Sequence, residues 1–209
     1  MPDTLYAMPG TCALAPNIAV AWLDAPIEVR TMDYGDHEKP DYLKVNDKGK
    51  VPALRFEDGD VLTEAAAILS YLGAAYGDGS YARDTRLGRK EAEALSYMTS
   101  EVHAAYAGHF AAQSLADGEA AQAAVKEKAY ETLGGHYQRL DEKLQAAGAE
   151  FYLGQKSFAD AYLYVLCRWI EQTPLSIDDY PALKAHRARM ERDEGVRTAL
   201  ERQRMEPVG

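Results

Sequence analysis

Residues 3–23, DTLYAMPGTCALAPNIAVAWL, decide how the chain begins to fold. Residues 3–7 favour a short strand, and Pro9 and Gly10 end it because these residue types favour turns. Apolar residues then recur with helical spacing from Leu14 to Leu23. The stretch therefore predicts a strand, a loop and a helix, with Cys12 in the loop immediately before the helix.

The rest of the first 77 residues continues an α/β pattern. Residues 27–33 alternate apolar and polar side chains with period two, which favours a second strand. Residues 51–56 and 60–62 flank Glu57-Asp58-Gly59, a compact hairpin signal. The alanine-rich stretch after Thr63 predicts a helix that ends at glycines. The order is β-α-β, a loop over the residues in between, then β-β-α.

The remainder of the chain has only helical patterns. From Arg86 to about Gly148 the spacing is helical, and we expect breaks near Asp117-Gly118 and Gly134-Gly135. Ser157 and Asp160, three residues apart, form a capping-box variant at the start of a mostly buried helix. Two shorter helices are expected after Pro181 and Gly195. The sequence thus predicts an α/β domain over 1–77 and an all-helical domain over 85–209, with the boundary in 77–85.

Charge and composition argue against several classes of protein. The 33 acidic and 23 basic residues give a net charge of −10, whereas nucleic-acid grooves and anionic membrane surfaces attract clustered cations. The five histidines show no metal-ligand spacing, so no metal is expected. No apolar run approaches the roughly 18 residues of a membrane helix, and no secretory pattern is present. With only Cys12 and Cys167 as cysteines, we expect a reducing, cytoplasmic environment.

Cys12 is the first candidate for chemistry. Its predicted place at a helix start favours the thiolate, because unsatisfied amides there stabilise negative charge. The alternative is a small buried apolar residue. Cys167 lies within the apolar run YVLCRW and is interpreted as core packing.

Two further places offer backbone groups to a ligand. A cis bond at Val51-Pro52 would leave the Val51 backbone open to an extended peptide, but a trans proline that simply begins a strand fits equally well. At Glu64 and Ala65 the amides of a helix start can hold a carboxylate, and Glu64 can hold an ammonium group. Alternatively, Thr63 caps that helix and Glu64 serves its dipole. Together with Cys12, these places suit a small thiol peptide with an α-amino acid end.

Six segments in order carry a resemblance to a known family. They are PGTCALAPNIAVAW, NDKGKVPAL, LTEAAAILSYL, SEVHAAY, SFADAYLYVLCRW and EGVRTALE. This ordered set resembles the bacterial beta-class glutathione S-transferases over essentially the whole chain. The resemblance implies a thioredoxin-like N-terminal domain, a helical C-terminal domain, glutathione as cosubstrate and a homodimer.

Position by position, the resemblance assigns roles to individual residues. Cys12 matches the active-site cysteine close to the glutathione sulfur, and His103 matches a histidine of the helical domain near that thiol. Val51-Pro52 matches the backbone that pairs with the tripeptide, and Glu64 and Ala65 match the pair that holds its γ-glutamyl end. Further matches to the glutathione site are His37, Lys39, Ser96 and Ser100. Tyr106, Phe110 and Trp169 are candidates for the second-substrate wall, although each could equally be core.

Some of these residues have another explanation or depart from the family pattern. The polar stripe of Ser96, Ser100 and His103 could face a wet cleft, but a purely structural histidine would show the same pattern. Ala65 replaces a usual serine, which removes one hydrogen bond to the γ-glutamyl carboxylate. His37 stands where a lysine is common. Tyr6 is interpreted as a core aromatic rather than as a thiol-activating tyrosine.

Three functions follow from these features. The first is conjugation of the glutathione thiolate to small hydrophobic electrophiles. The second uses Cys12 as the nucleophile, through a mixed disulfide with glutathione, for thiol transfer, peroxide reduction or reductive dehalogenation. The third is a binding protein with little turnover, which the changes at Ala65 and His37 favour.

Overall fold

The computed structural model describes residues 2–80, 82, 84–148 and 150–208, and they form two compact units. The first unit comprises Met1–Ala92 and Arg189–Gly209, and the second comprises Glu93–Ala188. The predicted boundary region contains Tyr81 and Arg83, which lie outside the described residues. The predicted domains, 1–77 and 85–209, are each continuous in sequence. The compact units differ from them, because the last residues of the chain group with the N-terminal half.

A four-stranded mixed sheet organises the first unit. Its strands are β1 (Thr4–Ala7), β2 (Glu28–Thr31), β3 (Ala53–Arg55) and β4 (Val61–Thr63), in the order β2-β1-β3-β4. β1 pairs in parallel with β2, and it pairs antiparallel with β3, where Leu5 lies opposite Leu54. β3 and β4 form the predicted hairpin. The predicted β-α-β, β-β-α order is confirmed.

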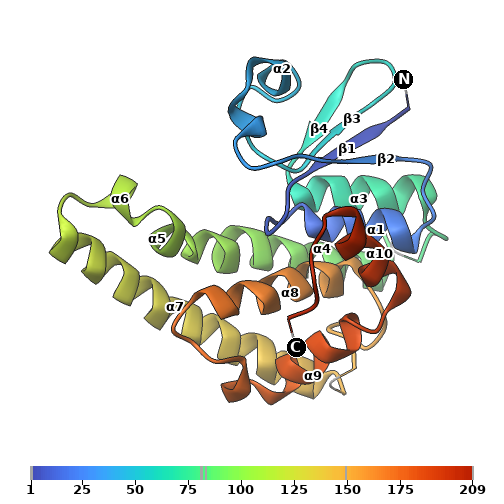
Figure 1. Cartoon of the computed structure of the whole chain (residues 1–209). Helices are drawn as coiled ribbons and strands as arrows, with labels where there is room; N and C mark the ends of the chain where they lie inside the picture. The colour runs from blue at the N-terminus through green and yellow to red at the C-terminus, as the bar shows by residue number, and fades with distance from the viewer. Residues whose placement is uncertain (1, 81, 83, 149, 209) are drawn as a thin grey trace. The chain divides into compact units, whose positions relative to one another are not determined.

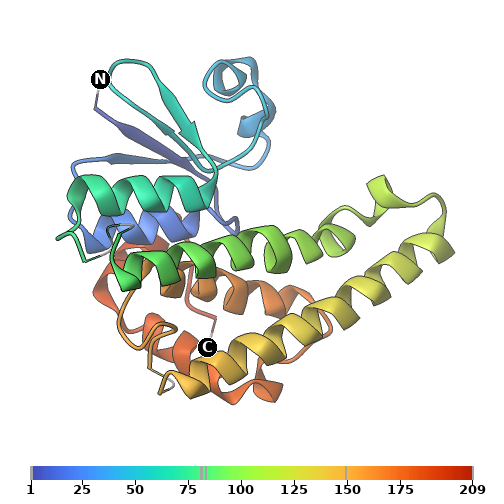
Figure 2. The same cartoon turned by 180° about the vertical axis from the view of Figure 1, so that it is seen from behind.

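Two helices cover one face of this sheet, as Figures 1 and 2 show from opposite sides. They are α1 (Leu14–Trp22) and α3 (Ala65–Tyr76). Side chains alternate across a strand, so Leu5 and Leu54 point to this face together. The fully buried core here also includes Ile18, Ile68, Leu69 and Leu72.

The opposite face of the sheet is covered by a segment that we expected to be a loop. It contains the one-turn helix η1 (Asp36–Glu38) and the short helix α2 (Pro40–Leu43). Such short helices leave no periodic signal in the sequence. Tyr42 of α2 packs in a cluster with Tyr6, Met32 and Ala53. The ring centroids of Tyr6 and Tyr42 lie 5.5 Å apart, which confirms Tyr6 as a core aromatic.

The last helix of the chain, α10 (Glu194–Arg202), packs against α1 within the same unit (Figure 1). Trp22 Nε1 donates to Asp193 Oδ1 at 2.7 Å, and Asn17 Nδ2 donates to the Ala199 carbonyl at 3.0 Å. A Cβ at Gly195 would lie 2.4 Å from Trp22 Cδ1, so the helices approach closely only because this residue is glycine. These contacts explain why the final residues group with the N-terminal half.

All the regular elements of the second unit are helices within its described residues, as predicted. Helix α4 (Arg86–Tyr97) leads into it and continues as the π-helical segment η2 (Met98–His103). The later elements are α5 (Ala107–Phe110), α6 (Ala112–Leu115), α7 (Glu119–Ala146), α8 (Phe158–Trp169), η3 (Ile170–Gln172), η4 (Ile177–Asp179) and α9 (Pro181–Met190), which ends just inside the first unit.

One of the two predicted helix breaks is wrong. The break near Gly118 is confirmed, because this residue has φ +85° and precedes α7. The expected break at Gly134-Gly135 does not occur, and α7 is continuous through both residues. Good helix formers on both sides outweigh the two glycines. Gly134 also lies close to Tyr180 and Leu175, so a small residue at this position lets these side chains pack against α7.

The predicted capping box of α8 is confirmed. Asp160 Oδ2 accepts hydrogen bonds from the Ser157 amide at 2.9 Å and from its hydroxyl at 2.8 Å. Cys167 is fully buried in α8, and this burial raises its pKa to about 12, so its role in the core is also confirmed.

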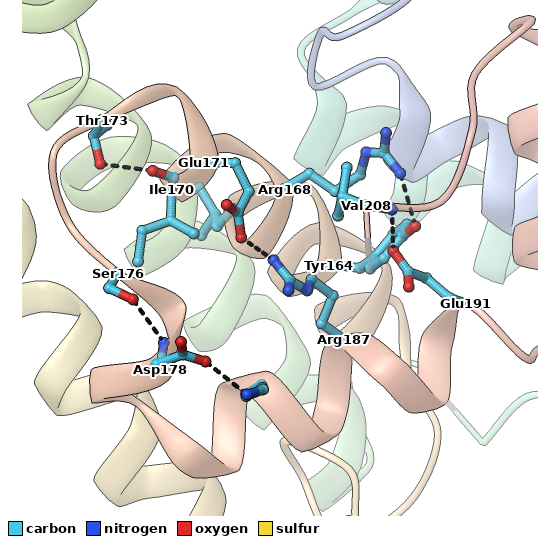
Figure 3. Close-up of polar contacts among 12 residues, drawn as sticks. Tyr164, Arg168, Ile170, Glu171, Thr173, Ser176, Asp178, Arg187, Glu191 and Val208 are labelled. Carbon is cyan, nitrogen blue, oxygen red and sulfur yellow. Dashed lines mark hydrogen bonds and ion pairs between the residues drawn. The ribbon is translucent and has the colours of Figure 1, made fainter.

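Figure 3 shows polar contacts within α8 and between η3 and α9. Arg187 of α9 is paired with Glu171 of η3, and Arg168 Nη1 donates to Tyr164 Oη at 3.0 Å. Arg187 is buried and Glu171 is partly exposed, so this pair fixes α9 against η3.

Candidate active site

Cys12 lies two residues before α1, as the sequence predicts. Thr11 shapes this turn: its hydroxyl donates to the Met8 carbonyl at 2.7 Å and accepts from the Ala13 amide at 3.3 Å. The Cys12 carbonyl accepts from the Ala15 amide at 3.1 Å, which begins the helical bonding. Cys12 is partly exposed, in contrast to the sealed Cys167. The thiol is therefore held at the positive end of α1, where negative charge is stabilised.

The Val51-Pro52 peptide bond is cis, which decides between the two alternatives left by the sequence. Cys12 Sγ lies 3.9 Å from the Val51 carbonyl oxygen, so the thiol and this backbone edge meet at one place. Both belong to the first unit.

The residues that support Val51 were missed by sequence reasoning. The Lys50 carbonyl accepts from Tyr42 Oη at 2.6 Å and from Asn46 Nδ2 at 2.7 Å. Burial raises the pKa of Tyr42 to about 12, which keeps its hydroxyl a donor. The signal available was the turn sequence NDKG, in which Gly49 has φ +60° and lies against the His37 carbonyl.

Glu64 stands at the start of α3 in an unusual backbone conformation, with φ +70°. Thr63 belongs to β4, so the alternative in which it caps the helix is wrong. The Glu64 side chain is 76% exposed, and its Oε1 lies 3.5 Å from Lys48 Nζ. An exposed pair of this kind contributes little to stability. The carboxylate is thus accessible to another ammonium group, beside the first-turn amides of α3.

His37 and Lys39 lie in and beside η1, on the segment that carries α2. Lys39 Nζ donates to Asp36 Oδ1 at 2.6 Å, and this hydrogen bond raises the pKa of Lys39 and lowers that of Asp36. His37 is mostly buried, and its Nδ1 has no hydrogen-bond partner among the described residues. Its Nε2 lies 3.8 Å from Glu38 Oε1.

In the second unit, His103 is the last residue of η2. A π-helical turn is rare and occurs frequently at functional sites. His103 Nδ1 lies 2.7 Å from Tyr162 Oη, and its ring meets the Trp169 ring edge-on with centroids 4.7 Å apart. Two residues of α8 therefore hold the imidazole.

Ser96 and Ser100 lie on the exposed side of α4 and η2. The Ser100 hydroxyl donates to the Ser96 carbonyl at 2.7 Å, and the Thr99 hydroxyl donates to the Leu95 carbonyl at 2.8 Å. Such side-chain bonds satisfy carbonyls where the helix widens. The Ser100 hydroxyl proton is thus engaged locally, while its oxygen remains an acceptor.

The three candidates for the second-substrate wall form one aromatic cluster. Tyr106 contacts Trp169 edge-on with centroids 5.2 Å apart, and it stacks on Phe110 at 5.4 Å. Tyr106 is fully buried and Trp169 nearly so, whereas Phe110 is 45% exposed. Within the cluster, Phe110 is therefore the ring that a ligand can contact, and Tyr106 packs beneath it.

The described residues contain neither a metal-binding cluster nor a membrane-spanning helix. Within those residues, no group of three or more histidine, cysteine and acidic side chains has metal-binding geometry. No helix in that part of the chain is both long and apolar enough to span a membrane.

Comparisons with known proteins define the family. The model described as "Glutathione S-transferase, N-terminal domain" matches residues 5–80, and that for the C-terminal domain matches residues 92–194. A protein of Xanthomonas campestris named "Glutathione S-transferase GST-4.5" is 31% identical over 204 residues, 94% of this chain and 97% of that protein. The chain belongs to the glutathione S-transferase family.

Solved structures agree with this assignment. A glutathione S-transferase from Xylella fastidiosa has a TM-score of 0.89 at 33% identity, covering 98% of this chain and all of that one. A sphingomonad enzyme solved with glutathione has a TM-score of 0.84 at 30% identity, covering 97% of this chain and all of that one. A beta-class enzyme of Sphingomonas chungbukensis scores 0.81 at 31% identity, covering 96% of this chain and 98% of its own. The resemblance to the bacterial beta class is supported.

Proposed function

We propose that this transferase conjugates the glutathione thiolate to small hydrophobic electrophiles. The observation that carries the proposal is the 3.9 Å approach of Cys12 Sγ to the Val51 carbonyl at the start of α1. It joins a thiol position to a backbone edge suited to an extended peptide. The family membership and the glutathione bound to the sphingomonad relative support the same ligand.

In this proposal the first unit binds the tripeptide through three contacts. The amides of Ala65 and its neighbours, at the positive end of α3, hold the γ-glutamyl carboxylate. The Glu64 carboxylate binds the α-ammonium group of glutathione, which takes the place of the Lys48 ammonium group as its partner. The Val51 backbone pairs with the cysteinyl residue. His37 and Lys39, which the resemblance matches to the glutathione site, are proposed as further contacts to the tripeptide.

The proposed chemistry rests on stabilising a thiolate and positioning it. Amides at the start of α1 and a hydrogen bond from Cys12 favour the ionised glutathione sulfur, and His103 is proposed as a further donor. The thiolate attacks an electrophilic carbon, a carbon–sulfur bond forms, and the leaving group departs with its electron pair. Holding both reactants in place removes the entropy cost of their encounter.

The second substrate is proposed to bind against the aromatic cluster of the second unit. Phe110 is the partly exposed member, so it is the better candidate for direct contact. Tyr106 and Trp169 act in this proposal by supporting the Phe110 ring. Replacing Phe110 with alanine should therefore raise KM for an apolar electrophile and leave the affinity for glutathione unchanged.

Calorimetric titration of glutathione, followed by an assay with a generic aryl halide, tests the proposal. We expect saturable binding and turnover, with both reduced in Glu64→Gln. Lys44→Gln is a matched control, because Lys44 is exposed and pairs only with Asp41 at 2.9 Å in the described structure. Binding without turnover would favour the low-turnover binding protein instead, and no binding would contradict a glutathione site.

A second candidate function follows from the partial exposure of Cys12, which differs from the fully buried Cys167. The Cys12 thiolate can attack the glutathione sulfur of a mixed disulfide between glutathione and a second thiol, which forms a Cys12–glutathione disulfide and releases the second thiol as its thiolate. A free glutathione thiolate then attacks the Cys12–glutathione disulfide, restores Cys12 and leaves as glutathione disulfide. In Cys12→Ala this exchange should vanish, while conjugation should survive in part. Equal loss of both activities would contradict the separation of roles.

The proposal also includes the oligomeric state of the protein and its cellular environment. We propose a homodimer, as the resemblance to the beta class implies, and analytical ultracentrifugation would test it. The reducing, cytoplasmic environment expected from the two separate cysteines also remains part of the proposal.

A further inference from the structure

His103 is held by a tyrosine that sequence reasoning did not assign to the site. Tyr162, near the middle of α8, is 1% exposed, and its hydroxyl oxygen lies 2.7 Å from His103 Nδ1. The edge of Trp169 lies against the same imidazole with ring centroids 4.7 Å apart. These contacts all lie within the second unit.

The proton in this contact has two arrangements. Either the phenol donates to Nδ1 and the ring proton lies on Nε2, or Nδ1–H donates to the phenol oxygen. A phenol is the more acidic donor, and a neutral imidazole nitrogen is the more basic acceptor, so the first arrangement is favoured. The buried Tyr162 has little water with which to replace this bond, in contrast to an exposed tyrosine.

We infer that Tyr162 is a positioning residue that holds His103 in the tautomer with its proton on Nε2. The hydroxyl sets the tautomer, and the Trp169 edge limits rotation of the ring, so Nε2 is a hydrogen-bond donor in a fixed direction. This deepens the proposed function and rests on it where glutathione is concerned. In that reaction His103 donates a hydrogen bond to the glutathione thiolate; it does not remove the thiol proton.

The second unit contains two similar pairs that serve as comparisons. His109 Nδ1 lies 2.9 Å from Tyr130 Oη, and His136 Nδ1 lies 2.8 Å from Tyr97 Oη. Tyr130 and Tyr97 are partly exposed, whereas Tyr162 is buried. His109 also packs edge-on against Phe110 with centroids 4.8 Å apart, so its pair lies beside the proposed second-substrate wall. Tyr97→Phe is therefore the control, because it removes a similar hydroxyl from His136, a histidine with no role in the proposed reaction.

The first test needs neither substrate nor activity. Long-range ¹⁵N–¹H spectra of histidine-labelled protein, recorded about two pH units above the usual histidine pKa, report the tautomer of each ring. His103→Gln assigns the His103 signals. We expect a protonated Nε2 and an unprotonated Nδ1 at His103, a mixture of tautomers in Tyr162→Phe, and no change at His103 in Tyr97→Phe. A proton on Nδ1 of wild-type His103, or an unchanged pattern in Tyr162→Phe, would overturn the inference.

The second test measures what the tautomer does. In Tyr162→Phe we expect kcat for conjugation to fall about 10-fold, the equivalent of one hydrogen bond, with the Kd for glutathione nearly unchanged. Tyr97→Phe should keep the wild-type kcat. A changed tautomer with an unchanged kcat would overturn the positioning role. If the wild type binds no glutathione but shows the expected tautomer, the proposed function fails and the assignment at His103 stands.

Discussion

Ala65 is the first residue of α3 and supplies a backbone amide with no side-chain donor. Glu64 beside it already has φ +70°, which turns the chain so that the first amides of α3 are available. A hydroxyl at position 65 would add a hydrogen bond to the same carboxylate that the amides are proposed to hold. The strength of glutathione binding should therefore respond to this one side chain.

Ala65→Ser should strengthen glutathione binding about 5- to 10-fold, because one added hydrogen bond contributes about 1 to 1.4 kcal/mol. Calorimetry of the wild type and the variant measures this change. Ala67→Ser, one half-turn further along α3, is the control and should leave Kd unchanged. An equal gain in both variants would show that the effect is not local to position 65.

For single residues, the sequence predicts the positions that depend only on neighbouring residues in the chain. Cys12 is placed correctly because the strand, turn and helix around it are contiguous. Tyr42 and Asn46, which hold the Lys50 carbonyl, and Tyr162, which contacts His103, were not found. The first two act through a folded turn, and Tyr162 is 59 residues from its partner, so no local pattern reveals it.

Glycine has opposite effects in different helices of this protein. Gly135 lies in the middle of α7, and a Cβ there would meet open space. Gly195 lies at the start of α10, where a Cβ would meet the Trp22 ring. The sequence alone led us to expect a break at the first and did not identify the close approach at the second, because both depend on what packs nearby.

The two glycines should respond in opposite directions to alanine. Gly135→Ala should raise the free energy of unfolding by about 0.5 to 1 kcal/mol, since it lowers the entropy cost of an exposed helix interior. Gly195→Ala should lower it by about 1 to 3 kcal/mol through overpacking between α10 and α1. Urea unfolding measures both. Destabilisation by Gly135→Ala would contradict a continuous, exposed α7 at this position.

For the whole molecule, many buried tyrosines make stability sensitive to alkaline pH. Burial raises the pKa of Tyr106, Tyr137 and Tyr152 above the ordinary value of 10. Above pH 10 the unfolded chain loses these protons while the folded chain keeps them. The unfolded state then binds fewer protons, so the free energy of unfolding falls as pH rises.

Between about pH 8 and about pH 11, we expect a steep loss of thermal stability. Tyr106→Phe should reduce the dependence on pH, because it removes one of the groups with a raised pKa. Tyr34→Phe is the control: this side chain is 90% exposed, and its loss should leave the slope unchanged. Equal stability at both ends of this range would contradict the burial of these hydroxyls in the folded state.

The overall architecture was predictable because each half has a consistent pattern: short alternating strands with helices first, then helices alone. The grouping of the last residues with the N-terminal half was not, since it depends on Trp22, Asn17 and Gly195 meeting across the chain. The net charge of −10 leaves a bound carboxylate dependent on local dipoles, in keeping with the site proposed at α3.

A crystal structure of this protein with glutathione tests the central claim most directly. We predict the γ-glutamyl carboxylate at the first amides of α3, the cysteinyl backbone paired with Val51, and the glutathione sulfur within about 4 Å of Cys12 Sγ, a hydrogen-bonding distance for sulfur. Glutathione bound away from these residues, or a Cys12 thiol with no room beside it for the peptide, would contradict the account.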